Sequence, residues 1–197
     1  IPHLSDPADR EILTLLAGGK DMAANNNYYG YGYSFDSIPN GYQLTGLLPQ
    51  AIIPMIARTG RARLRLMELA DVLLPFEWDD GEPYEFWLKV DRSENGKQYI
   101  LTGELRRGDE LMSLRTPAVL LDDGILLTRQ KAARFDSRGG FNWVALMRQQ
   151  KVMVVPVGQR DELLGEILKA PQLPRLDLPE EMSYEEAVIR PRPHLMI

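Results

Sequence analysis

Arginines at alternate positions are the side chains of this chain that are best placed to contact a charged ligand. Arg61, Arg63 and Arg65 alternate with apolar residues. Successive side chains of a β-strand point to opposite faces, so the three guanidiniums would share one face while the apolar residues turn to the core. A row of guanidiniums can follow a phosphate backbone. The alternation therefore predicts a nucleic-acid contact.

Arg106 and Arg107 directly follow a second predicted strand, and they are candidates to extend this basic strip. The alternative is that the arginines pair with acids across the sheet, as charged strand faces commonly do. Glu85, Glu104 and Asp109 are the acids best placed for that pairing. The sequence leaves both possibilities open, because either arrangement needs the same alternation.

Adjacent carboxylates are the second feature that could do chemistry. Asp79 and Asp80 stand next to each other before Gly81, and the same pattern recurs at 122–124. Two neighbouring aspartates can be ligands of Mg²⁺. Because no third carboxylate lies at a recognisable spacing, and because aspartate before glycine is typical of turns, we predict a turn at both places and no metal site.

The residue types that enzymes commonly use are sparse. The chain has no cysteine, and its two histidines, His3 and His194, lie near opposite ends. The stretch 18–20 lacks the upstream glycine and the following Ser/Thr of a P-loop, and no dinucleotide fingerprint surrounds Gly30 and Gly32. We predict no catalytic residue, no metal and no cofactor. An unrecognised hydrolase remains as an alternative, marked by a pocket of converging polar groups with perturbed acids.

The elements that would position these side chains centre on the stretch 84–135. Its apolar residues alternate with polar ones, and Asn95-Gly96 and Gly108-Asp109 are dipeptides typical of turns. We predict an α+β fold: an antiparallel β-meander of about five to seven strands, flanked by a few short helices. The predicted strands are 84–91, 99–105, 111–114, 119–121, 125–128 and 152–155.

Short amphipathic segments predict the helices. Asp6 and Pro7 are typical of a helix start. The apolar stretch 47–57 predicts a buried helix with Pro49 in its first turn, which Pro54 would kink or shorten. Further helices are predicted at 141–150 and 158–169.

The chain divides into a predicted single α+β domain over 1–170 and an extended, proline-rich connector over 171–197 that leads toward a missing C-terminal module. Within the domain, a mobile loop is predicted near 20–42. Its run of tyrosines could stack on bases or pack on a partner, or could be a variable surface insertion. Because Ile1 is not a methionine, we expect a piece of a longer protein.

Composition narrows the class of protein. The 197 residues are 44% hydrophobic and 26% charged, which is ordinary for a globular protein. The net charge of −5 gives no global attraction to nucleic acid or to anionic membranes. No apolar run approaches the roughly 18 residues of a membrane helix, and no signal peptide is visible. We predict a cytoplasmic protein without a membrane partner.

Six short segments of the chain form a recognisable series: 5–11, 57–61, 78–84, 103–108, 176–181 and 190–193. Each is a turn or a connector, and their order along the chain carries the weight. Together they resemble the region that precedes the motor in bacterial SWI/SNF-type helicase-like ATPases.

The resemblance implies a non-catalytic accessory domain beside an ATPase that moves on duplex DNA. The expected partners are the C-terminal ATPase motor of the same polypeptide and possibly duplex DNA. Neither ATP binding nor any binding residue of the family carries over to this chain. A protein-interaction module without nucleic-acid contact is the alternative.

Overall fold

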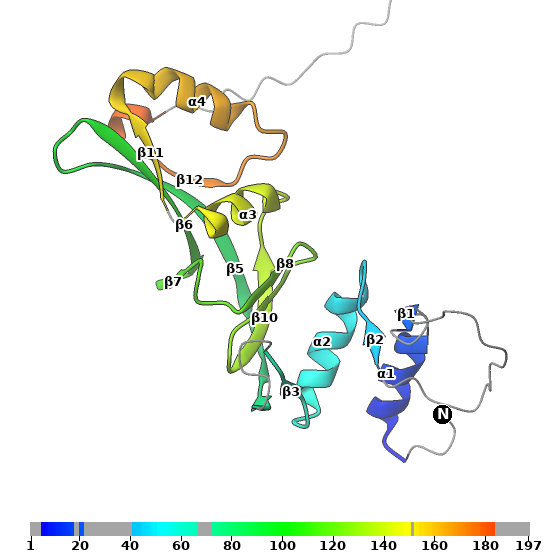
Figure 1. Cartoon of the computed structure of the whole chain (residues 1–197). Coiled ribbons are helices and arrows are strands. Elements are labelled where there is room, and N and C mark those ends of the chain that lie inside the picture. Colours follow the sequence, from blue (N-terminus) through cyan, green and yellow to red (C-terminus); the bar gives the residue numbers. More distant parts are fainter. Residues whose placement is uncertain (1–4, 18–19, 22–40, 67–71, 151, 184–197) are drawn as a thin grey trace, which may run out of the picture.

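Two long antiparallel strands, β5 (Glu77–Arg92) and β6 (Gln98–Arg107), form the centre of the molecule (Figure 1). In β5 the side chains of Phe86, Leu88 and Val90 are buried while their neighbours are more exposed, as the alternating pattern predicts. Gly96, at φ +67°, forms the turn between the two strands. The computed structural model describes residues 5–17, 20–21, 41–66, 72–150 and 152–183.

Shorter strands flank both sides of this pair and complete an eight-stranded sheet. β7 (Glu110–Ser113) and β11 (Met153–Pro156) lie antiparallel to β6, whereas β10 (Lys131–Asp136) and β12 (Arg175–Asp177) lie parallel to β5. β9 (Ile125–Leu127) and β8 (Val119–Leu121) continue the sheet beyond β10. The α+β prediction is confirmed.

The connectivity differs from a simple meander. After β7 the chain crosses from the β6 side to the β5 side before it forms β8, β9 and β10. A strand that returns after such a crossing can run parallel to its neighbour, which a hairpin connection does not allow. The sheet is therefore mostly antiparallel with two parallel additions.

Four α-helices, two 3₁₀-helices (η3, Val157–Gln159, and η4, Glu180–Met182) and two small hairpins complete the described part of the chain. Asp6 caps the first helix, because its Oδ1 accepts the Ala8 N–H at 2.9 Å, as predicted. Figure 1 shows α4 and β11 at one end of the molecule and α1 with α2 at the other. No helix in the described ranges is long and apolar enough to cross a membrane. The α-helices are α1 (Pro7–Ala17), α2 (Leu48–Arg58), α3 (Phe141–Gln149) and α4 (Arg160–Leu168); the hairpins are β1 (Lys20–Asp21) with β2 (Tyr42–Gln43) and β3 (Arg63–Leu64) with β4 (Leu74–Pro75).

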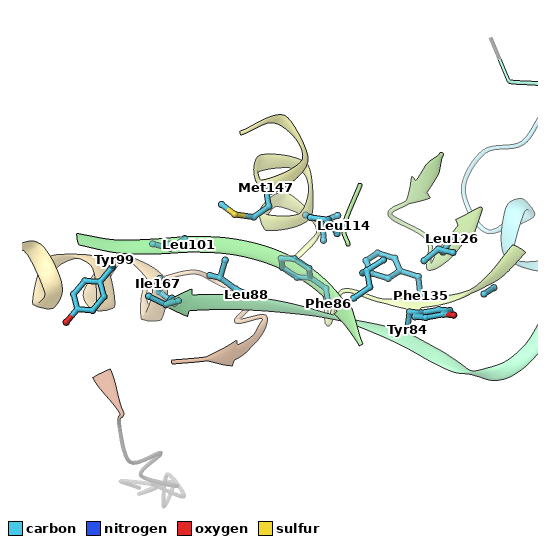
Figure 2. Close-up of a cluster of buried hydrophobic side chains, with 14 of the residues drawn as sticks. Tyr84, Phe86, Leu88, Tyr99, Leu101, Leu114, Leu126, Phe135, Met147 and Ile167 are labelled. Carbon is cyan, nitrogen blue, oxygen red and sulfur yellow. The ribbon is translucent and has the colours of Figure 1, made fainter. Parts of the chain in front are cut away.

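The main core lies between one face of the sheet and α3 with α4. Met147 of α3 and Ile167 of α4 are buried against β5 and β6. Figure 2 shows Met147 and Leu114 on the same side of β6. The backbone of β6 approaches both at Gly103, where a Cβ atom would lie 2.8 Å from Leu114 and 3.0 Å from Met147.

A second, smaller core holds α2 against the opposite face of β9 and β10. Ile125 and Leu127 belong to this second core, whereas Leu126 between them belongs to the main core. In the same way, Ala132 belongs to the second core and Ala133 to the main core. This end of the sheet is therefore covered on both faces, which explains why all three residues of β9 are buried.

One local prediction, the first of the two aspartate turns, is wrong. Asp79 and Asp80 form no turn, because both lie within β5, where the pairing with β10 shifts register between Ala133 and Phe135. The predicted helix over 47–57 is confirmed as α2, and Pro54 does not shorten it, since α2 continues to Arg58. By contrast, the turn at 122–124 is confirmed by Gly124, at φ +89°.

The predicted connector over 171–197 is also wrong in its described part. Arg175 to Asp177 form β12, and Met182 is buried in the main core. Most of the predicted loop near 20–42, with its tyrosine run, and residues 184–197 lie outside the described residues.

Candidate functional site

The first predicted arginines lie beside α1 and α2. Arg61 makes a bidentate ion pair with Asp9, at 2.5 and 3.0 Å, and lies 3.2 Å from Asp6. The hydrogen bond from Arg61 holds the pKa of the Asp9 carboxyl below its ordinary value. Arg63 donates to the Ala62 carbonyl at 2.7 Å. The alternation of exposure is as predicted, although the acids that pair with Arg61 come from α1 and not from the sheet.

Arg106 lies on the outer face of the main sheet. It is paired with Glu104 and with Asp177 of β12, and its guanidinium lies 4.4 Å from the centre of the Trp87 ring. Arg175 approaches the same ring at 5.5 Å and pairs with Glu85 at 2.5 Å. Two arginines thus clamp one tryptophan and join β12 to β5 and β6.

Arg107 lies on the opposite face, because adjacent residues of a strand point to opposite sides. It pairs with Asp79 and with Glu110, each at 2.8 Å, and its guanidinium lies 4.1 Å from the Tyr84 ring centre. Lys131 donates to Asp79 at 3.0 Å and to the Tyr84 hydroxyl at 2.9 Å. We call these five residues the Asp79 cluster.

The pKa directions in the Asp79 cluster are those of a structural ion-pair network. Burial alone would raise the pKa of Asp79, but hydrogen bonds from Lys131, Arg107 and the Gly81 N–H lower it to about 2. The pKa of Glu110 is lowered by its hydrogen bond from Tyr84, and that of Lys131 is raised, because its hydrogen bonds outweigh burial. The acids and the lysine are held in their charged forms.

The five predicted arginines therefore do not line one surface. Arg106 and Arg107 face opposite sides of the main sheet, and both are paired with acids. Arg61 belongs to the α1 contact. Arg63 and Arg65 are exposed, and no acid lies within ion-pair distance of either in the described part of the chain. The nucleic-acid contact stays a prediction, reduced to this pair.

A cleft of about 670 Å³ lies between α2 and the strands β5, β9 and β10. α2 turns its apolar strip, which includes Ile52 and Ala57, inward, and the other strip of the helix lines the cleft. Gln50, Pro54 and Arg58, spaced four residues apart, share that strip. The remaining lining residues are Ala51, Met55, Trp78, Asp80, Pro83, Asp123, Gly124, Ile125, Arg134, Phe135 and Asp136.

Both arginines that line the cleft make polar contacts with other groups of the chain. Arg58 is paired with Asp80, which also accepts the Trp78 indole N–H at 3.0 Å, and its guanidinium lies 5.9 Å from the Trp78 ring. Arg134 donates to the Gly81 carbonyl at 3.0 Å. Arg58 is thus neutralised by an acid, whereas Arg134 keeps its charge and is held only by a backbone carbonyl.

Asp123 is the acid of the cleft with an unusual environment. Its Oδ1 is buried and has no hydrogen-bond partner in the described structure. Burial raises the pKa of this carboxyl, opposite to the shift at Asp79. Gln50 of α2 donates to the Asp123 backbone carbonyl and so fastens the helix to the β8–β9 turn.

Few features of the sequence indicate this cleft. Asp122 and Asp123 look alike in the sequence, and only the packing of α2 on the turn distinguishes them. Pro54 was a usable signal, because a proline inside a helix deprives the carbonyl one turn earlier of its donor. Among the described residues no group of three or more His, Cys, Asp or Glu side chains could hold a metal ion.

No family model matches this chain, and no curated protein or solved structure matches it significantly. The resemblance to the SWI/SNF-type accessory region therefore stays a prediction.

Proposed function

We propose that this chain is a non-catalytic accessory domain of a bacterial SWI/SNF-type DNA-dependent ATPase, that it acts in the cytoplasm, and that it docks on the motor of the same polypeptide. The observation that carries the docking role is the lining of the α2 cleft. Trp78, Met55, Arg58 and Arg134 are of the residue types that are enriched at protein interfaces, and they surround an open hollow of about 670 Å³.

The Asp79 cluster supports a non-catalytic role. A catalytic acid or base commonly has a pKa moved toward neutrality, whereas the shifts of Asp79, Glu110 and Lys131 move away from it. These charges hold β5, β7 and β10 together. Structural pairing accounts for them without a substrate.

The perturbed Asp123 is the one feature that favours the hydrolase alternative. The other two cleft carboxylates are already bound, since Asp80 pairs with Arg58 and the Asp136 Oδ1 accepts the Arg138 N–H at 2.7 Å. Nucleophilic or general acid–base chemistry commonly needs a second group within hydrogen-bond distance of the first. Asp123 Oδ1 has no such partner among the described residues.

Titration calorimetry between this chain and the separately expressed motor of the parent polypeptide tests the docking role. We expect the double substitution Met55→Ala with Arg58→Ala to weaken binding by at least about tenfold, because interface anchors of these types contribute strongly. Arg115→Ala, an exposed arginine outside the cleft, is the matched control. Absence of a binding signal at two temperatures, or equal affinity of the cleft variant, would overturn the proposal.

Duplex DNA is a second candidate partner, favoured by the exposure of Arg63 and Arg65. Because the net charge is −5, such a contact would be local and strongly dependent on salt.

A further inference from the structure

We propose that the α2 cleft binds an arginine or lysine side chain of the docking partner, with Asp123 as the group that recognises its positive charge. The inference deepens the docking role, on which it rests. The side chain that occupies the cleft would have a cationic group at the end of an aliphatic chain.

The charge balance of the cleft favours a cation. Arg58 is neutralised by Asp80, and Arg134 is engaged with a backbone carbonyl. Asp123 and Asp136 have no ion-pair partner among the described residues, and the lining, with three aspartates and two arginines, has a formal surplus of one negative charge. A buried carboxylate oxygen without a donor costs free energy, which a bound ammonium or guanidinium would offset.

The backbone of α2 adds an acceptor at the same place. Pro54 has no N–H, so it cannot donate to the carbonyl of Gln50, one turn earlier in the helix. Gln50 is also a residue of the cleft lining, and its side chain contacts the Asp123 turn. A guanidinium carries five N–H donors and an ammonium three, which suits a wall rich in acceptors.

The remaining lining fits the stem of such a side chain. Trp78, Met55 and Pro54 provide apolar surface beside the acceptors. Lysine and arginine commonly pack their methylene groups on apolar surface while the head stays with polar partners. Gln50 is exposed and donates to the Asp123 backbone carbonyl, so it holds this wall of the cleft to the turn that carries the carboxylate.

The test uses capped dipeptides as probes and the indole N–H signal of Trp78 in a ¹⁵N–¹H spectrum as the readout. Acetyl-leucyl-arginine amide is compared with its citrulline counterpart, which has the same shape but no charge, and with its glutamate counterpart. We expect the arginine probe to shift the signal saturably and to bind at least about tenfold more tightly than the citrulline probe. Asp123→Asn should abolish this difference.

Asp122→Asn is the matched control, because it removes the same charge from the neighbouring residue of the same turn. The discrimination should persist in that variant. Equal binding of the arginine and citrulline probes, tighter binding of the glutamate probe, no binding of any probe, or persistence of the discrimination in Asp123→Asn would each overturn the inference.

The same variants in calorimetry with the motor separate the two proposals. If Asp123→Asn binds the motor like the wild type, the inference fails while docking stands. If the wild type discriminates the probes but does not bind the motor, the proposed partner is wrong while the cleft chemistry stands.

Discussion

Gly103 shows how tightly one residue of β6 is fitted to its surroundings. A methyl group at this position would lie 2.8 Å from Leu114, and 3.0 Å from both Met147 and Phe86. We expect Gly103→Ala to lower the free energy of unfolding by about 1–3 kcal/mol, because overpacking forces neighbours off their preferred positions. Urea denaturation measures it.

Gly165 of α4 is the matched control, because a Cβ atom there meets nothing within 4 Å. Gly165→Ala adds the same methyl group to an open helical site and should stabilise the protein by about 0.5–1 kcal/mol. Equal effects of the two substitutions would contradict the close approach of α3 to β6.

Asp79 gives a prediction for the pH dependence of stability. Its pKa is lowered from 3.8 to about 2 in the folded chain. The stabilisation, about 2 kcal/mol, is therefore fully present above pH ~4 and is lost as the pH falls toward 2. We expect Asp79→Asn to be less stable by that amount at pH 7 and the difference to vanish near pH 2, as measured by thermal unfolding across this range.

Asp80→Asn is the comparison for this experiment. The Asp80 side chain is 71% exposed against 19% for Asp79, so its ion pair with Arg58 should contribute little. If Asp80→Asn costs as much as Asp79→Asn, or if the Asp79→Asn difference persists to pH 2, the structural role of the Asp79 cluster is wrong.

Asp79 and Asp80 also show which contacts could not be predicted from the sequence. Asp79 and Asp80 carry the signature of a turn, and the sequence contains no sign that β5 extends through them. The place of Asp79 depends on two cations that are distant in sequence: Arg107, which the pairing of β6 with β5 brings near, and Lys131, which the crossing of the chain after β7 brings near. Such long-range pairing is invisible to local propensity.

Among the elements, the segment 61–66 carries the remaining nucleic-acid prediction. We expect Arg63→Ala with Arg65→Ala to weaken binding to duplex DNA at low salt and to reduce the salt slope by about two, one for each lost phosphate contact. Fluorescence anisotropy over a range of salt concentrations measures both. Arg115→Ala with Arg138→Ala removes two exposed arginines elsewhere and should leave the slope unchanged; identical slopes for both pairs would discard this contact.

The strand β12 makes a prediction for truncation. A chain that ends at residue 170 would lose the pairing of β12 with β5 and the buried Met182. We expect it to be less stable than a chain that ends at residue 183 by more than about 2 kcal/mol, because a buried methionine alone contributes that much. Equal thermal unfolding of the two chains would show that the sheet ends before β12.

Elements with a strong local pattern were predictable. The alternation in β5 and β6, the glycines of their turns and the starts of α1 and α2 all follow from neighbouring residues. β12 was not, because its three residues pair only through a parallel contact with β5 and stand among prolines that read as a connector. The place of β10 between β5 and β9 was hidden for the same reason.

At the scale of the whole molecule, several charged side chains form ion pairs that connect different elements of the fold. Ion pairs join α1 to the start of β3, β12 to β6, and β10 to β5. An acidic chain with internally paired arginines favours a protein partner over a polyanion. In the α2 cleft, Asp123 and Asp136 have no ion-pair partner among the described residues.

The three tryptophans of the chain lie on three different surfaces, which allows one spectrum to locate a partner. Trp78 lines the α2 cleft, Trp87 lies between two arginines on the outer face of the sheet, and Trp143 belongs to α3. We would add the unlabelled motor to ¹⁵N-labelled chain and follow the three indole N–H signals. Docking in the cleft predicts a change at Trp78 with Trp87 and Trp143 unaffected. A change confined to Trp87 or Trp143, or no change at saturating motor, would contradict it.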